Sequence, residues 1–163
     1  MNTDIVSAWT FVRGESLCFE ALAPGHTLMV GDAVAMSLPL RVHDRDGAVV
    51  VGFLIQHDEA VKVARNMFAQ PDGEVSALDL RDAGLEACNV LAGCVAASWA
   101  VSERVEIGLP RALDMAEYLE IARIASVRAC YVGKPKGAVD NIRVVMTVFD
   151  FPAPGGERPA AAE

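Results

Sequence analysis

Apolar residues recur along the chain with two periods, one typical of helices and one typical of strands. In residues 4–22 they return every three or four positions, which predicts a helix that ends before Pro24-Gly25. The positions that carry this pattern are Ile5, Ala8, Trp9, Val12 and Leu17. Residues 26–36 and 38–43 lack the helical period and are expected to be extended, with a turn at Gly31-Asp32.

An almost unbroken apolar run follows at residues 48–55, and it is rich in β-branched side chains. This run predicts a central strand that is buried on both faces. The residues before it, Asp44 to Gly47, predict a hairpin turn because Asp-Gly tolerates a positive φ. After it, Asp58 is placed to cap a helix over residues 59–70, which would end at the Pro-Asp-Gly sequence that begins with Pro71.

The second half of the chain contains the longest helical pattern, at residues 76–99. Residues 114–121 fit a short helix or a loop equally well. Strands are expected at residues 103–109, 126–132 and 142–149, and the last two should form a closing hairpin. Because strands and helices are segregated along the chain, the order predicts an α+β fold, with a largely antiparallel sheet and long helices packed on it.

Length and composition fit one domain. The 163 residues are 53% hydrophobic, which is enough for a core, and we assign residues 1–150 to the domain. The Pro-, Gly- and Ala-rich residues 151–163 are expected to form a disordered tail. No apolar run is long enough to cross a membrane, and the N-terminus lacks the basic start of a secretory signal, so we expect a cytoplasmic protein.

Charge and cysteine spacing exclude further classes. A formal net charge of −8 argues against nucleic-acid binding and against docking to an anionic membrane. The four cysteines form no C-x-x-C pair and lie far in sequence from the three histidines, which argues against a zinc site. Buried, reduced thiols are the simpler expectation; the cysteines are Cys18, Cys88, Cys94 and Cys130.

The helix predicted at residues 76–99 has two different faces at 100° per residue. One face should pack on the core, and Gly84 within it would let a neighbour approach closely; its other members are Leu85, Cys88, Leu91, Ala92, Val95 and Trp99. The opposite stripe is polar at first and then nearly without side chains: Asp79, Asp82, Glu86, Asn89, Gly93 and Ala97. A mid-helix glycine costs about 1 kcal/mol relative to alanine, and close approach of a partner would explain it.

Residues 85–93, Leu-Glu-Ala-Cys-Asn-Val-Leu-Ala-Gly, resemble the signature helix of the CheC/CheX/FliY family of chemotaxis phosphatases. That family has a Glu, an Asn three residues later and a Gly four residues after the Asn. The similarity spans roughly residues 28–150. It includes the Asn66–Ala69 segment before the signature helix and the Ile107–Pro110 segment after it. One copy of the motif resembles the CheX branch, and Cys94 stands where the family often has a polar residue.

The resemblance implies an enzyme that removes the phosphoryl group from the aspartate of a CheY-like receiver domain. By this resemblance, Asn89 would position the attacking water, and Glu86 would pair with a lysine of the receiver. Asp82 and Gly93 would contact the partner, although a solvated carboxylate near a helix N-terminus is the simpler interpretation of Asp82. The receiver would supply the Mg²⁺, and no cofactor is expected on this chain.

Two alternatives to an enzyme remain open. The chain could be a non-catalytic module of the same fold that docks a receiver domain or a signalling complex, or a dimerising domain without a site. The CheX branch also implies a homodimer joined through its sheets. The apolar strand at residues 142–149 would supply an edge for that contact, because exposed edges are usually protected.

Overall fold

The computed structural model describes residues 2–23, 31–43, 46–69, 74–99, 104–138 and 140–152. Helices and strands alternate irregularly along these residues. In chain order they are α1 (Asn2–Arg13), β1 (Cys18–Leu22), β2 (Ala33–Val42), β3 (Ala48–Gln56), α2 (His57–Met67), α3 (Ala77–Trp99), β4 (Val105–Ile107), β5 (Arg111–Leu113), α4 (Met115–Ile124), β6 (Ser126–Lys134) and β7 (Val144–Phe151).

The strands form one seven-stranded sheet in the order β1-β6-β7-β3-β2-β4, and β5 also pairs with β2. Every pair of strands is antiparallel. The apolar run at β3 is central, with β2 on one side and β7 on the other, and it is buried along most of its length. The α+β class and the central strand are therefore confirmed.

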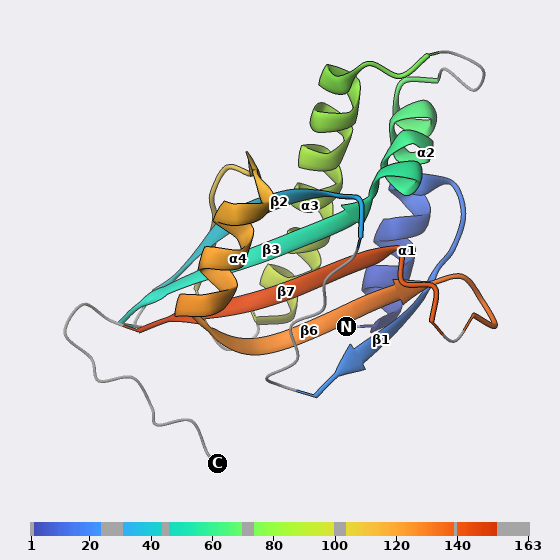
Figure 1. Cartoon of the computed structure of the whole chain (residues 1–163). Helices are drawn as coiled ribbons and strands as arrows, with labels where there is room; N and C mark the ends of the chain where they lie inside the picture. Colours follow the sequence, from blue (N-terminus) through green and yellow to red (C-terminus); the bar gives the residue numbers. More distant parts are fainter. Residues whose placement is uncertain are drawn as a thin grey trace.

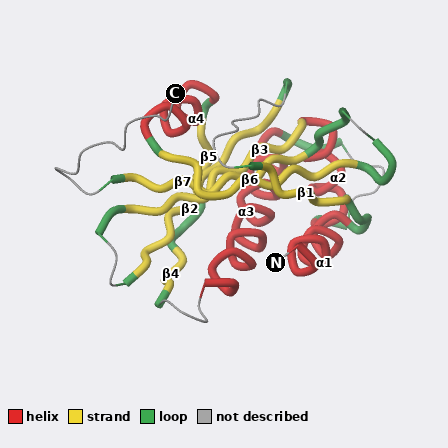
Figure 2. Tube along the Cα trace, turned by 90° about the horizontal axis from the view of Figure 1, so that it is seen from below, coloured by secondary structure: helices red, strands yellow, loops and turns green. Residues whose placement is uncertain are grey.

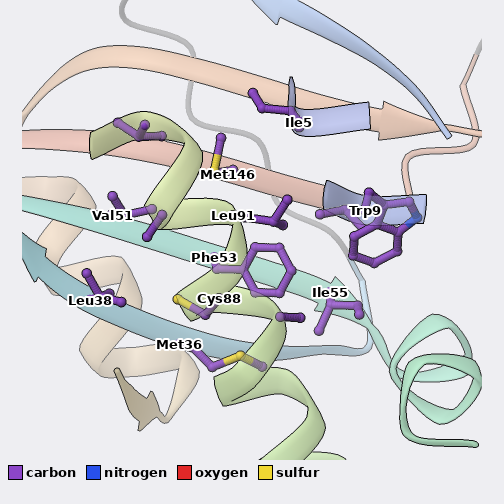
Figure 3. Close-up of a cluster of buried hydrophobic side chains, with 14 of the residues drawn as sticks. Ile5, Trp9, Met36, Leu38, Val51, Phe53, Ile55, Cys88, Leu91 and Met146 are labelled. Atoms are coloured by element: carbon purple, nitrogen blue, oxygen red, sulfur yellow. The ribbon is translucent and has the colours of Figure 1, made fainter. Parts of the chain in front are cut away.

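Helices cover both faces of the sheet, but unequally. The first three helices lie on one face and α4 lies on the other (Figures 1 and 2). The larger core lies between α1–α3 and the sheet, where Trp9, Phe53 and Leu91 are fully buried (Figure 3). The smaller core lies under α4, where Tyr118 packs edge-to-face on Phe149. The long helix α3 thus sits on the better buried face.

The helix expected at residues 4–22 is wrong in its second half. The helix α1 ends at Arg13, and Gly14 follows with a φ of 79°, a left-handed conformation that glycine adopts without strain. Beyond this break the chain alternates, so that Leu17 and Phe19 point inward, and residues 18–22 pair with β6 as a strand. The helical spacing of Leu17 from the earlier apolar residues was coincidental.

Asp58 does not cap α2, as its position suggested. The helix begins at His57, two residues before the expected start at residue 59, and its N-cap residue, Gln56, makes no side-chain cap. Instead, the Asp58 carboxylate forms an ion pair with Arg143, which also donates to the side chain of Gln56 at 3.0 Å. Local sequence predicted a helix in this segment, which spans His57–Met67 in the structure, but the tertiary contact with Arg143 decided the role of the carboxylate.

Other expected boundaries change in detail. The two extended stretches before the hairpin are one continuous strand, β2, within the described residues. The strand at residues 103–109 is shorter, and a further strand, β5, follows it. The ambiguous segment is the helix α4, which a reciprocal capping box between Asp114 and Glu117 begins.

The hairpins β2–β3 and β6–β7 are both present. However, β7 lies inside the sheet between β6 and β3, so it offers no exposed edge and gives no argument for a dimer. Phe151, which was expected to begin the tail, is instead the last residue of β7 and pairs with Ala48. Expectations for residues 24–30, for the start of the turn at residues 44–45 and for the rest of the tail from residue 153 lie outside the described residues.

Candidate functional site

The helix α3 carries every residue that the sequence singled out as a candidate. Its start is held by a reciprocal pair of hydrogen bonds: the Asp79 backbone N–H donates to the Ser76 Oγ at 3.1 Å, and the Ser76 backbone N–H donates to the Asp79 carboxylate at 2.9 Å. The Ser76 hydroxyl donates to the same carboxylate at 2.6 Å. These hydrogen bonds lower the pKa of Asp79, and they define the first turn of the helix.

One face of α3 is tightly packed, and this packing sets the rotation of the helix. Cys88 and Leu91 are fully buried in the core cluster that also contains Phe53 of β3 (Figure 3). A Cβ placed on Gly84 would lie 2.4 Å from the Cε of Met36, so the side chain of Met36 occupies the space beside this glycine. The predicted core face is confirmed for these residues, whereas Leu85 and Trp99 are only partly buried.

The opposite face of α3 presents the candidate pair to solvent. Glu86 and Asn89 are both exposed, one helical turn apart. Within the described part of the chain, neither side chain has a hydrogen-bond or ion-pair partner. Asp82 is exposed one turn earlier on the same stripe. The carboxylate and the carboxamide are thus available to an external partner, as the helical pattern predicted.

Gly93 continues this stripe with open space. A Cβ built on it would find no atom within 4 Å, so no contact among the described residues requires a glycine there. Ala97, one turn further, is exposed. The surface beyond Asn89 therefore has no large side chains and is accessible, which suits close approach of the backbone of another protein.

A groove of about 480 Å³ opens beside Glu86. The ends of α1 and α2 form two of its walls and α3 forms the third; the residues that line it are Phe11, Val12, Asn66, Met67, Phe68, Asp82 and Glu86. Sequence reasoning missed this groove. Phe11 could have signalled it, because it lies outside the set of inward-facing α1 positions that contains Ile5, Trp9 and Val12.

The walls of the groove are tied together by the ends of two helices. The Asn66 side-chain amide donates to the backbone carbonyl of Val12 at 2.9 Å, which links α2 to α1. Phe68 closes α2 with a backbone hydrogen bond to Ala64, and Ala69 follows with a φ of 52°. The Asn66 side chain and the backbone of Val12, Ala64 and Phe68 make these contacts within the chain, so the walls of the groove are held in place without a partner.

Other chemistry on this surface is limited. Burial raises the pKa of the Cys88 thiol to about 12, and burial followed by the nearby Asp4 raises that of Cys94, so neither is a ready nucleophile. Among the residues that the structure describes, no group of three or more His, Cys, Asp or Glu side chains is placed to hold a metal ion. No described helix is long and apolar enough to cross a membrane.

The pair can take part in two kinds of contact. An exposed carboxylate can form a charge-assisted hydrogen bond with a cation of another protein. A carboxamide can both donate to and accept from a water molecule, so it can hold that water in one orientation. Neither group needs a metal on this chain for these contacts.

Comparison by sequence finds no match to any protein-family model and none to a curated protein. Comparison by structure finds several. CheX from Desulfovibrio desulfuricans is 12% identical, with a TM-score of 0.60 over 91% of this chain and 94% of that one. CheX from Vibrio vulnificus is 10% identical, with a TM-score of 0.60 over 91% of each chain.

A third match comes from a complex of CheX with CheY, BeF3 and Mg²⁺ from Borrelia burgdorferi. It is 13% identical, with a TM-score of 0.59 over 91% of this chain and 93% of that one. Proteins described as CheC-like and FliY also match. At these identities the likeness concerns the fold, and it covers almost the whole chain. The chain therefore has the fold of the CheX, CheC-like and FliY chemotaxis proteins, which the resemblance of its long helix predicted.

Proposed function

We propose that the protein hydrolyses the aspartyl phosphate of a CheY-like receiver domain. One observation carries the proposal: Glu86 and Asn89 stand exposed on the outer face of α3, without hydrogen-bond or ion-pair partners among the described residues, at the spacing of the family's signature motif. The fold supports it, since a CheX with this fold was solved together with CheY, BeF3 and Mg²⁺.

In the proposed reaction, water attacks the phosphorus of the acyl phosphate in line with the bond that breaks. The bond between phosphorus and the aspartate oxygen breaks, the carboxylate leaves with the electron pair, and the water proton is released with inorganic phosphate. Such a reaction depends mainly on positioning and on charge stabilisation. The Asn89 carboxamide would hold the water, and the Mg²⁺ would belong to the receiver.

Glu86 would have a separate task, because it lies one turn before Asn89 on the exposed stripe. Its carboxylate would pair with a lysine of the receiver and so fix the position of α3 over the phosphoryl group. The open surface at Gly93 would let the receiver backbone approach the helix. Asp82 would lie at the margin of the same contact.

The proposal is tested by following receiver dephosphorylation. Each stand-alone receiver domain encoded in the genome that carries this chain would be phosphorylated with a small phosphodonor. Its decay would then be measured with wild type, Asn89→Ala and Glu86→Ala. Arg81→Ala, which changes an exposed residue of α3 outside the groove and outside the pair, is the matched control.

We expect wild type and the control to accelerate decay of one receiver equally. Asn89→Ala should bind that receiver and lose turnover by about 100-fold, the scale of a misplaced reactant. Glu86→Ala should weaken both binding and turnover. If Asn89→Ala turned over like wild type, the amide would not position the water. Binding without turnover by wild type would favour the docking module, and absence of both would leave only the fold.

We also propose, from the resemblance alone, that the protein is a homodimer. Among the described strands, β1 pairs on one side only, with β6, and leaves its other edge unpaired. Sedimentation equilibrium of the full chain tests this proposal, and a single monomeric species at micromolar concentration would contradict it.

A further inference from the structure

The groove beside Glu86 exposes aromatic rings that the fold itself does not use. Phe11 is 79% exposed and Phe68 is 41% exposed, although their neighbours Val12 and Ala64 are buried in the core. Large aromatic side chains are depleted from solvated surfaces and enriched where proteins contact one another. Two of them on the walls of one groove indicate a contact surface rather than a solvated one.

The charges at the groove suit a basic neighbour. Asp82 and Glu86 stand at one wall, and neither carboxylate has a partner among the described residues. The opposite walls are mostly apolar, with Phe11 and Met67 among their lining residues. A partner that fits must therefore present a basic side chain next to an apolar one.

The groove is also continuous with the proposed catalytic surface. Glu86 lines it, and Asn89 lies one turn further along the same stripe of α3. A protein that pairs with Glu86 and reaches Asn89 would extend over the groove, because the walls begin directly beside Glu86. No separate partner is needed to explain the exposed rings.

We propose that this groove is a second contact region for the phosphorylated receiver domain, and that it takes an apolar side chain of the receiver beside the basic one that pairs with Glu86. The inference rests on the proposed function for the identity of the occupant. In this proposal the residues have separate roles. Asn89 orients the reacting water, and Glu86 sets the position of the receiver. Phe11 and Phe68 contribute binding affinity and selectivity for the partner. The pre-formed walls of the groove favour binding of the receiver, because few side chains of this protein have to be ordered when it binds.

The experiment measures binding and turnover separately. Phe11→Ala and Phe68→Ala would be compared with wild type in two assays: binding to the receiver that the dephosphorylation screen selects, activated with BeF3 and Mg²⁺, and dephosphorylation of that receiver. Leu109→Ala is the matched control, because Leu109 is an equally exposed apolar residue, at 86%, outside the groove. Phe11→Leu keeps an apolar side chain at the groove and tests for partial rescue.

We expect Phe11→Ala to raise Kd and KM by about tenfold with kcat unchanged, as for a buried interface aromatic. Phe68→Ala should act in the same direction, Phe11→Leu should recover part of the affinity, and Leu109→Ala should match wild type. The loss of affinity in Phe11→Ala should persist from low to high salt. Asp82→Asn should also weaken binding at low salt, and this loss of affinity should become smaller as salt screens the charge of Asp82 in wild type. Circular dichroism would confirm that the exposed substitutions leave the fold intact.

The two proposals fail in different ways. If wild type dephosphorylates a receiver and both phenylalanine variants bind it normally, the groove proposal is overturned and the proposed function stands. If wild type binds a receiver without turnover, the catalytic proposal fails, and the variants still decide the groove by their Kd. If wild type neither binds nor dephosphorylates any receiver, both are overturned.

Discussion

The two faces of α3 place small residues in opposite surroundings. On the inner face, Gly84 lies against Met36, where an added Cβ would come within 2.4 Å of another atom. On the outer face, no atom of the described residues lies within 4 Å of a Cβ added to Gly93. The inner glycine is therefore explained by packing within the chain. The outer glycine lowers helix stability, and no packing contact among the described residues requires it.

The same contrast holds for the larger residues of the helix. Leu91 is fully buried in the core, whereas Asn89, two residues earlier, is exposed and has no partner among the described residues. One face thus determines how the helix sits on the sheet, and the proposed function uses the other. Substitutions on the two faces should consequently separate stability from activity.

The largest expected effect tests this separation directly. Leu91→Ala should lower the free energy of unfolding by about 2–5 kcal/mol, because it removes a fully buried side chain from the core. Asn89→Ala should leave that free energy unchanged or slightly raised, since alanine is the better helix former, while turnover collapses. Urea denaturation beside the dephosphorylation assay measures both. A large loss of stability in Asn89→Ala would contradict the assignment of the outer face to function.

Substitution of the two glycines by alanine tests the same difference between the faces of α3, with a smaller expected change in the free energy of unfolding. Gly84→Ala gains helix propensity but must displace the buried end of Met36, an overpacking cost of about 1–3 kcal/mol. Gly93→Ala should raise the free energy of unfolding by up to about 1 kcal/mol. Gly93→Ala should therefore raise the melting temperature, and Gly84→Ala should raise it less or lower it.

Gly93→Ala should also lower the dephosphorylation rate, because its methyl group would stand in the path of the receiver backbone. The activity of Gly84→Ala, corrected for the folded fraction, should stay near that of wild type. Full activity in Gly93→Ala would show that the open surface is not used for close approach.

The smallest effect concerns pH and the first turn of α3. Hydrogen bonds from Ser76 lower the pKa of Asp79 from its ordinary value of 3.8. A carboxyl whose pKa is lowered on folding stabilises the fold above its unfolded value, and this contribution is lost as pH falls through the lower folded value. The stability gap between wild type and Asp79→Asn should thus be present at pH 7 and close below pH 3.8.

Melting curves across this pH range, with Asp82→Asn as a control, measure the gap. Asp82 is an exposed carboxylate one turn later that makes no hydrogen bond among the described residues. A gap for Asp79→Asn that stayed constant down to pH 2 would show that the capping bonds do not contribute through the ionised carboxylate.

Sequence patterns predicted an element correctly where a long run of periodic positions, or a turn residue, was compatible with only one structure. The helical spacing of apolar and polar residues at positions 76–99 placed Glu86 and Asn89 on the outer face of α3. The apolar run at residues 48–55 identified the central strand. Short segments were less certain. The helix expected over residues 4–22 divided at Gly14, because pairing with β6 outweighed a weak helical period in residues 18–22.

The sequence by itself determined the fold class, the two faces of the long helix and the exposed Glu-Asn pair, because each depends on local periodicity. Only the tertiary structure decided what lies beside that pair. The groove joins Phe11 to Phe68 and to Glu86, three residues that are far apart in the chain and come from three helices. The ion pair of Asp58 with Arg143 likewise joins distant segments. No local pattern records such neighbours, since they arise when separate elements pack on one sheet.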